Sequence, residues 1–476
     1  MANRFTMQQL LSRMTLYRKE SQDLEKQVQI SVQRMVQDKR IEFVQLLFGL
    51  SSEDLVHFPG IKSYCDYLEM EAFQALMNPN FGPIQGLVPC SSPLQVGDCW
   101  GWCIAVLQVL RSAQPETSIH DILRHLEEQS KLSRNDFDKR RDKSYLYLAI
   151  FGALCWTSMM VRPRLVFEDG VGPHLTCLLP DGARQPKHPQ SHRLTDRCMR
   201  PVVTTFRSFK QLHWTERSDE PPYGISREAD SLYAASLSFY SLRYFGHVTI
   251  QWVDTITEHL RFNPANRRLS LFRFPSFCAI LAVHSNETCP AVRSISEELE
   301  PLSSEDRDLC CVSLEQEVIF SYRILFGQDD MSRKLAHEEV CNLKQSRASQ
   351  SVDAMLLDLC ERKYKSGYLW WKRYDKVLRG YPPNVWPITC RSIEGHLQQS
   401  DVYSARDDFP RLGRRLIKLQ QFNLRQRPSK LTDLWRDRRN PLQWYTFWAV
   451  VLVGGVANIL AALQLLVAII ELQTSI

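Results

Sequence analysis

The sequence predicts a mainly α-helical protein of the α+β type: a helical region with a small β-containing part, followed by one C-terminal transmembrane helix. Three observations support this fold class. Apolar residues recur at helical spacing through most of the chain, short β-rich runs are confined to residues 163–300, and residues 444–470 contain no charged side chain. Apolar spacing distinguishes the two kinds of element because side chains repeat about every 3.6 residues in a helix and every two residues in a strand.

Composition places the chain among ordinary globular proteins. Of its 476 residues, 44% are hydrophobic and 24% are charged, which is incompatible with wholesale disorder. At roughly 150 residues per domain, the length allows two or three domains. The sequence has no repeat with a period of about 20 to 50 residues, so a solenoid is excluded.

Residues 1–50 are predicted to form one long helix. With Met7 at heptad position a, seven of the nine a and d positions from Met7 to Met35 are apolar. Two interpretations fit this register: a coiled coil, and an amphipathic helix packed on its own domain.

Residues 51–162 are predicted to be a helical unit with one long internal loop. Helical patterns cover residues 61–77, 99–113, 118–130 and 144–160, and a Gly- and Pro-containing segment separates the first two. The apolar run 145–160 has 16 residues, which is short for a membrane span. We therefore expect it to be a buried core helix.

Residues 163–300 are predicted to be an α+β part with a hairpin. The segment EHLRFNPANRRLSLFRFPSFCAILAV has the pattern of two strands joined by a turn at residues 263–266. Helical patterns return in residues 301–410, a helical and loop region that leads towards the C-terminal apolar segment.

Residues 411–443 are predicted to be a basic juxtamembrane collar. The segment has ten Lys and Arg residues and two acidic residues, a charge of +8, so the rest of the chain sums to 6 − 8 = −2. A nucleic-acid-binding protein is expected to carry its basic excess on a folded domain, and we therefore predict no nucleic-acid partner. The collar instead suits anionic lipid headgroups, with Arg436, Arg438 and Arg439 at the membrane surface.

Residues 444–470 are predicted to be a transmembrane helix. The 22 residues from Ala449 to Ile470 would make a helix of about 33 Å, which exceeds a hydrocarbon core of about 30 Å. Trp444 and Trp448 lie at its N-terminal end, where amphipathic aromatic rings favour the level of the headgroups.

The charges beside the span predict its orientation. By the positive-inside rule the basic collar stays in the cytosol, which leaves residues 471–476 as a short lumenal tail. The expected result is a tail-anchored, single-pass protein whose N-terminus is cytosolic. Because the tail has no Lys or Arg, the endoplasmic reticulum and endomembrane system are favoured over the mitochondrial outer membrane.

Small and polar residues share one face of the span. Gly454, Ala457, Asn458 and Ala461 are spaced i, i+3, i+4 and i+7. Small residues allow helices to approach closely, and Asn458 can hydrogen-bond across an interface, so one interpretation is self-association through the span or through the N-terminal helix. The other is that Gly and Ala are common in spans and that a single Asn is tolerated.

Motifs for catalysis or cofactor binding are absent from the sequence. It contains no phosphate-binding loop, GxGxxG fingerprint or GxSxG nucleophile elbow. His337 and Cys341 would share one face of a helix, but a zinc site needs more ligands and none is identifiable, so no metal or cofactor is predicted. Cys99 and Cys103 are expected in a tightly packed helix start, and Cys99 is the candidate if any thiol is reactive.

The 14 cysteines are predicted to be reduced and mostly buried. Residues 1–19 lack the apolar core of a signal peptide, so the sequence does not direct the chain into an oxidising compartment. The one glycosylation sequon, at Asn286, is then expected to stay unmodified.

Several blocks of sequence carry a resemblance to a protein family. The blocks are VDTITEHLRF, LSLFRFPSFC, ARDDFPRLGRRL and RPSKLTDLWRDRRNPLQWYTFWAV. They resemble a family of uncharacterised proteins from filamentous fungi that are predicted to be membrane proteins, with a basic, Trp-containing collar ahead of a C-terminal span. The resemblance implies a membrane setting and implies no activity, substrate or catalytic residue.

These observations lead us to expect a tail-anchored interaction or scaffold protein, with the lipid bilayer as its first partner and an α-rich region on the cytosolic face. The alternative is a membrane-anchored enzyme whose active site is assembled from Cys and His residues that are distant in the sequence.

Overall fold

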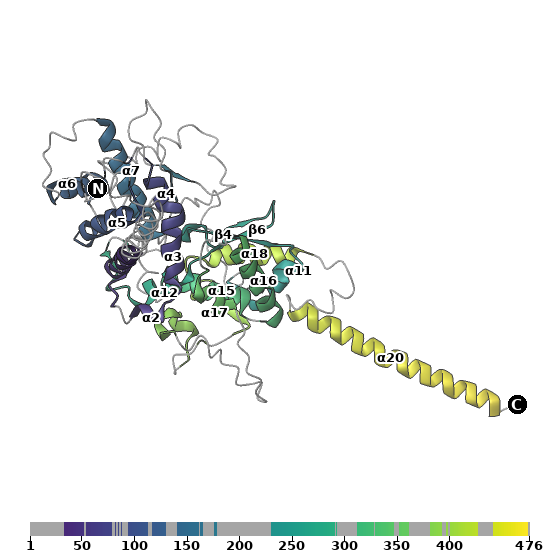
Figure 1. Ribbon diagram of the computed structural model, residues 1–476. Helices are drawn as coiled ribbons and strands as arrows, with labels where there is room; N and C mark the ends of the chain where they lie inside the picture. The colour runs from purple at the N-terminus through teal and green to yellow at the C-terminus, as the bar shows by residue number, and fades with distance from the viewer. Residues whose placement is uncertain are drawn as a thin grey trace, which may run out of the picture.

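The computed structural model confirms a mainly α protein with small sheets and one long apolar C-terminal helix. Figure 1 shows a folded body of helices and short strands, from which the last helix projects as a separate rod. The structure describes residues 33–51, 54–78, 81, 84, 87, 94–112, 117–129, 140–160, 162–164, 176–178, 230–290, 292, 312–327, 329–346, 352–360, 381–392, 397, 400–426 and 441–474.

Helices make up the N-terminal half of the body. They are residues 33–48, α2 (Asp54–His57), α3 (Ile61–Tyr67), the π-helical turn η1 (Leu68–Ala72), α4 (Phe73–Leu76), α5 (Val96–Arg111), α6 (Ile119–Gln129) and α7 (Arg140–Ser158). α5 begins at a reciprocal cap, in which Gln95 N donates to the Asp98 carboxylate at 2.9 Å. Ser118 and Asp121 cap α6 in the same way, at 3.0 and 3.1 Å. Such caps satisfy N–H groups that the first turn of a helix leaves unpaired.

The apolar run in α7 is a core helix, as the sequence predicts. Leu148, Ile150 and Phe151 are buried. Trp102 of α5 is also buried, and its indole N–H donates to the carbonyl oxygen of Ala149 at 3.3 Å. The burial of this run therefore agrees with the prediction, made from its short length, that it is a core helix.

The N-terminal helix is described from residue 33, so most of its predicted heptads lie outside the described residues. In residues 33–48, Phe43, Val44, Leu47 and Phe48 are buried in the core of the body, whereas Met35 is 47% exposed. This part is therefore an amphipathic helix packed on its own domain. A coiled coil formed by the preceding residues stays a prediction.

The strands in the described part of the chain form three small sheets. β1 (Arg162–Arg164) pairs with β2 (Thr176–Leu178), and β3 (Ser231–Tyr233) pairs with β7 (Val402–Ser404), both antiparallel. The third sheet has the order β4-β6-β5, in which β4 (Thr249–Val253) runs parallel to β6 (Arg268–Phe272) and β5 (Phe262–Asn263) runs antiparallel to it. The β5–β6 pair confirms the predicted hairpin at residues 263–266, and β4 is an addition that the sequence analysis missed.

The second predicted strand of the hairpin is shorter than expected. β6 ends at Phe272, and Pro275 begins the helix α12 (Pro275–Val283), in which Phe277, Cys278 and Ile280 are buried. Proline fits the first turn of a helix because its missing N–H would be unpaired there. A short run that is apolar on all sides has the same pattern in a buried strand and in a buried helix, which explains the error.

The rest of the body is again mostly helical. The short helices α10 (Ala234–Leu237) and α11 (Phe239–Tyr244) precede β4 in the sequence, and the turn η5 (Ile256–Glu258) lies between β4 and β5. The later elements are α15 (Leu314–Phe326), α16 (Asp330–Ser346), α17 (Ala354–Cys360), η7 (Pro383–Val385), η8 (Ile388–Cys390) and α18 (Gly413–Arg425). All 13 residues of α15 are buried, and it packs against α10, α12, α16 and α17. α15 is therefore the central helix of this half.

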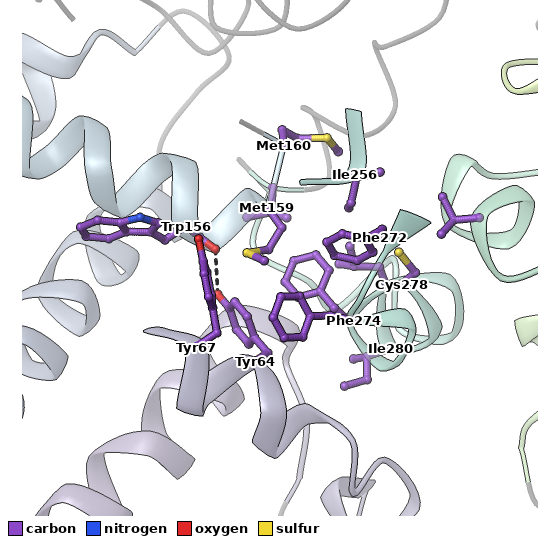
Figure 2. Packing of buried hydrophobic residues seen from close by; sticks show 14 of the residues in the cluster. Tyr64, Tyr67, Trp156, Met159, Met160, Ile256, Phe272, Phe274, Cys278 and Ile280 are labelled. Carbon is purple, nitrogen blue, oxygen red and sulfur yellow. Dashed lines mark hydrogen bonds between the residues drawn. The ribbon is translucent and has the colours of Figure 1, made fainter. Parts of the chain in front are cut away.

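One hydrophobic cluster runs through the body, from Phe43 to Leu419. Figure 2 shows a part of it where α3, α7, β6 and α12 meet, with the hydroxyl of Tyr64 donating to the carbonyl oxygen of Trp156 at 2.9 Å. Residues from the predicted segments 51–162, 163–300 and 301–410 all contribute to this cluster. These segments therefore share a core.

The first half of the predicted basic collar belongs to the folded body. α18 buries Leu416, Leu419 and Asn423 against it. Together with the buried Leu412 these residues are spaced i, i+4, i+7 and i+11, which is one helical face. The sequence analysis counted the charges of this segment and overlooked its apolar face, because the basic residues of α18 lie mostly between the apolar positions. Residues 427–440, the second half of the collar, lie outside the described residues.

Candidate functional site

The strongest functional feature is α20 (Pro441–Thr474), the helix that projects from the body in Figure 1. Within it, Tyr445–Ile470 is long and apolar enough to cross a membrane, and it is the one such helix in the described part of the chain. Its 26 residues correspond to about 39 Å of helix. None of the span is buried against the body, in contrast to the shorter apolar helix Tyr145–Ser158, which lies in the core. α20 is therefore not a core helix of the body.

The predicted span residues lie on α20. Trp444 is within the helix, and Trp448 lies near its start with its ring centre 6.0 Å from that of Phe447. The predicted small face and Ile470 are exposed on the rod: Gly454, Ala457, Asn458, Ala461 and Ile470. Self-association through this face stays a prediction. Arg436, Arg438 and Arg439 lie outside the described residues.

A buried carboxylate holds the start of α18. Glu317 of α15 is fully buried and accepts hydrogen bonds from the backbone N–H groups of Arg411 and Leu412, at 3.0 and 2.7 Å. The guanidinium of Arg411 also donates to Glu317, at 3.0 Å, and to the carbonyl oxygen of Val312. Burial raises the pKa of Glu317 to about 7, although Arg411 and the two backbone donors favour its ionised form.

Three further side chains fasten α18 to the body. Arg415 donates to the carbonyl oxygens of Thr257, at 2.8 Å, and of His259. Gln420 donates to the carbonyl oxygen of Ser231 at 2.9 Å, and Asn423 donates to the carbonyl oxygen of Ser236 at 2.6 Å. These donors are buried, so a rotation of α18 about its own axis would leave them without partners. The three side chains therefore hold α18 in one orientation.

His259 and Ser321 form a pair that resembles the base and nucleophile of a hydrolase. The His259 Nε2 lies 2.7 Å from the Ser321 Oγ, but its Nδ1 accepts the backbone N–H of Phe272 at 3.1 Å. The neutral ring therefore carries its proton on Nε2 and donates to Ser321, whose hydroxyl donates to the carbonyl oxygen of Val318 at 2.7 Å. A general base would need a free lone pair facing the serine. The pair is therefore structural.

Burial is the main influence on His259. The ring is completely buried, and this, together with the nearby charge of Arg415, lowers its pKa from 6.5 to about 3. The imidazole is thus neutral throughout the physiological range. It joins β6 to α15 and takes no part in proton transfer there.

Asp353 is a second buried carboxylate with a structural role. It accepts the backbone N–H and the hydroxyl of Ser276 at 2.9 and 2.6 Å, and the backbone N–H of Met355 at 2.8 Å. It thereby caps α17 and binds the first turn of α12. Gly60 is required at this junction, because a Cβ there would lie 2.0 Å from Ser276 and 2.1 Å from Asp353.

Arg273 is the centre of a buried charge cluster. Its guanidinium donates to Asp254, lies 3.6 Å from Glu71, and stacks 4.6 Å from the ring centre of Phe274. Removing one member of this cluster would leave a buried charge without its partner, so the cluster constrains how η1 packs against the chain that follows β4 and β6.

Burial disfavours the reactive thiolate form of most cysteines that the structure describes. Cys99, the candidate from the sequence, is buried, with its Sγ 4.0 Å from the carbonyl oxygen of Phe73. Burial raises the pKa of Cys65 and of Cys390 to about 12, and it raises the pKa values of Cys103 and Cys278 well above 9.0.

His337 and Cys341 share a face of α16, as predicted, with Nε2 and Sγ 3.5 Å apart. Among the described residues, no group of three or more His, Cys, Asp or Glu side chains is arranged to hold a metal ion.

The polar network around α15 was not predicted, although the sequence contained part of the signal. The run LEQEVIFSYRILF has acidic, hydroxyl and basic residues on every side of a strongly apolar helix. Such a helix indicates polar groups that must find partners inside a core. The partners themselves, such as Arg411 for Glu317, lie 94 residues away and carry no local signature.

Comparison of the chain with protein-family models, with curated proteins and with solved structures finds no match. The apolar helix α20 and the basic residues ahead of it are therefore the features on which a functional conclusion depends.

Proposed function

We propose that the protein is a tail-anchored, single-pass membrane protein, in which α20 spans the bilayer and the folded body is displayed on the cytosolic face as an interaction or scaffold module. The observation that carries the proposal is the 26-residue apolar span, in which no residue is buried in the body. A monomeric soluble protein rarely exposes so large an apolar surface, whereas a lipid bilayer covers it.

The orientation and the organelle follow from the charges beside α20. Arg436, Arg438 and Arg439 precede it, and residues 471–476 after the span contain no Lys or Arg. By the positive-inside rule the body faces the cytosol, and the endoplasmic reticulum and endomembrane system are the favoured location. The resemblance to a family of filamentous-fungal proteins that are predicted to be membrane proteins supports a membrane setting.

An interaction role is supported by the chemistry of the body. Its buried carboxylates, Glu317 and Asp353, and its buried imidazole, His259, all bind other parts of the same chain. This is the arrangement of groups that hold helices together. A body of this kind would recruit other proteins to the membrane surface.

Carbonate extraction of cell membranes tests the anchor. The full-length protein is expected in the membrane pellet. Leu460→Arg with Leu463→Arg should release it, because each Arg near the middle of a span costs about 2.5–3.5 kcal/mol of insertion free energy. The matched control, Met331→Arg with Ile388→Arg, replaces exposed apolar residues of the body and should stay in the pellet. Extraction of the wild type at alkaline pH would contradict the proposal.

The sequon at Asn286 tests the orientation. Asn286 is exposed, so it would be glycosylated if the body entered the lumen. We expect no glycan on Asn286 and a glycan on a sequon added after Ile476. Replacing Arg436, Arg438 and Arg439 by Gln should invert a fraction of the molecules and glycosylate Asn286 in that fraction. A glycan on Asn286 of the wild type would refute cytosolic display.

A further inference from the structure

We propose that the exposed face of α18 binds anionic lipid headgroups, so that the folded body rests on the surface of the membrane that α20 spans. This inference rests on the proposed function, because it takes the bilayer around α20 as the partner. Unlike the collar predicted from the sequence, this surface belongs to a folded helix with a fixed orientation.

The exposed face of α18 is a basic stripe. Arg414, Lys418, Gln421 and Arg425 are all exposed and are spaced i, i+4, i+7 and i+11. At about 100° per residue these positions lie within about 60° of one another around the helix. Three of the four are cations, and the stripe contains no acidic residue.

The opposite face of α18 is fixed to the body. Leu416 and Leu419 are buried, and the side chains of Arg415, Gln420 and Asn423 donate to backbone carbonyl oxygens of other elements. The helix therefore cannot rotate to pair its stripe with the body. Within the described residues, no ion pair joins Arg414, Lys418 or Arg425 to a carboxylate.

An apolar side chain accompanies the stripe. Leu424 precedes Arg425 and is 40% exposed, at the end of α18 nearest in sequence to the span. Basic residues beside an exposed apolar residue suit the membrane interface, where the charge meets the headgroups and the apolar group meets the acyl boundary. Nucleic acid would also bind the basic stripe, but its binding would not involve the exposed side chain of Leu424.

The chain length places this surface near the bilayer. Fifteen residues, 426–440, separate Arg425 from Pro441, the first residue of α20. Even a fully extended chain of that length reaches only about 50–60 Å. Anchoring by α20 therefore keeps the stripe at a high effective concentration next to the leaflet that faces the body. With the body in the cytosol, that leaflet is the one that carries anionic lipids.

The size of the effect follows from the number of cations. Attraction to an anionic leaflet favours the bound state by about fivefold for each Lys or Arg near its surface. Three cations thus shift the equilibrium between docked and undocked bodies by a factor on the order of 100. Because headgroup attraction is screened over about 8 Å at physiological salt, docking should weaken as salt is raised.

Site-specific photo-crosslinking in defined vesicles tests the proposal. The full chain, with a photo-crosslinking amino acid in place of Gln421, is reconstituted into vesicles of neutral lipid with or without about one third phosphatidylserine. We expect crosslinks to lipid only in the anionic vesicles. The variant R414Q/K418Q/R425Q should reduce the docking equilibrium by a factor on the order of 100. The matched variant R34Q/K62Q/R124Q removes three exposed cations elsewhere and should leave it unchanged.

The outcomes separate this inference from the proposed function. Flotation of the same samples reports insertion of α20, and a chain that does not float refutes the anchor. A chain that floats but gives no lipid crosslink from position 421 overturns docking by α18 and leaves the anchor intact. Equal crosslinking from a chain that carries the photo-crosslinking amino acid in place of Lys62 does the same. Equal crosslinking in neutral vesicles, or transfer of the crosslink to RNA added to the anionic vesicles, overturns it too.

Discussion

At the residue scale, the buried side chains of His259 and Glu317 use their polar atoms to bind other parts of the body. His259 accepts one backbone N–H and donates to Ser321, and Glu317 accepts two backbone N–H groups and the guanidinium of Arg411. In a low-dielectric core an unpaired polar group is costly, so these bonds select one packing of α15 against its neighbours. The same occupancy leaves Ser321 without the geometry of a nucleophile.

The depressed pKa of His259 predicts how stability depends on pH. Its pKa is about 3 in the folded protein and 6.5 for a solvated histidine, so below pH 6.5 the unfolded chain binds a proton that the folded protein does not. Stability should therefore fall as pH is lowered, by up to about 1.4 kcal/mol per unit. His259→Gln should lower stability at pH 7.5 and remove this slope.

The measurement is urea unfolding of the full chain in mild detergent, followed by tryptophan fluorescence. Between pH 7.5 and pH 5 the wild type should lose about 2 kcal/mol more than His259→Gln. The buried carboxylates of Glu317 and Asp353 are common to both proteins and cancel in this difference. His337→Gln, at an exposed position on α16, serves as the control. Parallel pH profiles for the wild type and His259→Gln would show that the ring is not buried and neutral.

At the element scale, α18 has two faces of different chemistry. Its inner face fastens to the body through Arg415, Gln420 and Asn423, and its outer face presents Arg414, Lys418 and Arg425. Glu317 binds the chain just ahead of it, at Arg411 and Leu412. These contacts therefore couple α18 to the core of the body.

Breaking the Glu317–Arg411 pair should loosen this coupling. Arg411→Met leaves the buried Glu317 without its cation, and we expect a loss of about 3–5 kcal/mol in the free energy of unfolding. Adding Glu317→Gln removes the stranded charge, so the double variant should be more stable than Arg411→Met alone. Urea unfolding at pH 8 measures both variants. Arg414→Met, on the exposed face, should change stability by less than about 0.5 kcal/mol. An equally small effect of Arg411→Met would mean that the pair is not buried in solution.

At the scale of the whole molecule, the chain divides into a body with a continuous core and a helix that adds nothing to that core. Buried hydrophobic residues extend from Phe43 to Leu419, whereas none of Tyr445–Ile470 is buried. Folding of the body and insertion of α20 are therefore separable.

Removal of α20 should yield a soluble, folded body. A chain that ends at Asn440 is expected to stay monomeric without detergent, and its free energy of unfolding should match that of the full chain to within about 0.5 kcal/mol. Analytical ultracentrifugation and urea unfolding provide the measurements. A chain that ends at Leu412 also lacks α18 and should aggregate, because it exposes the apolar surface that Leu416 and Leu419 cover. Aggregation of the longer chain would show that α20 belongs to the folded core.

Sequence reasoning predicted the helical elements best where the signal was local. The helical patterns of α5 and α6, the buried run of α7 and the turn of the β5–β6 hairpin each depend on residues within a few positions of one another. Sequence reasoning was wrong where a local pattern was compatible with two kinds of secondary structure. The run PSFCAILAV is apolar on all sides, so its periodicity could not distinguish the helix α12 from a strand.

The sequence by itself determined the candidate membrane span, because length, apolarity and the absence of charge are properties of one continuous segment. Only the tertiary structure decided which basic residues ahead of it belong to the body and which surface they form. Arg415 reaches the carbonyl oxygen of His259 across 156 positions, and Arg411 reaches Glu317 across 94. A contact between residues so far apart is set by the packing of the whole core, so it leaves no pattern in the neighbouring sequence.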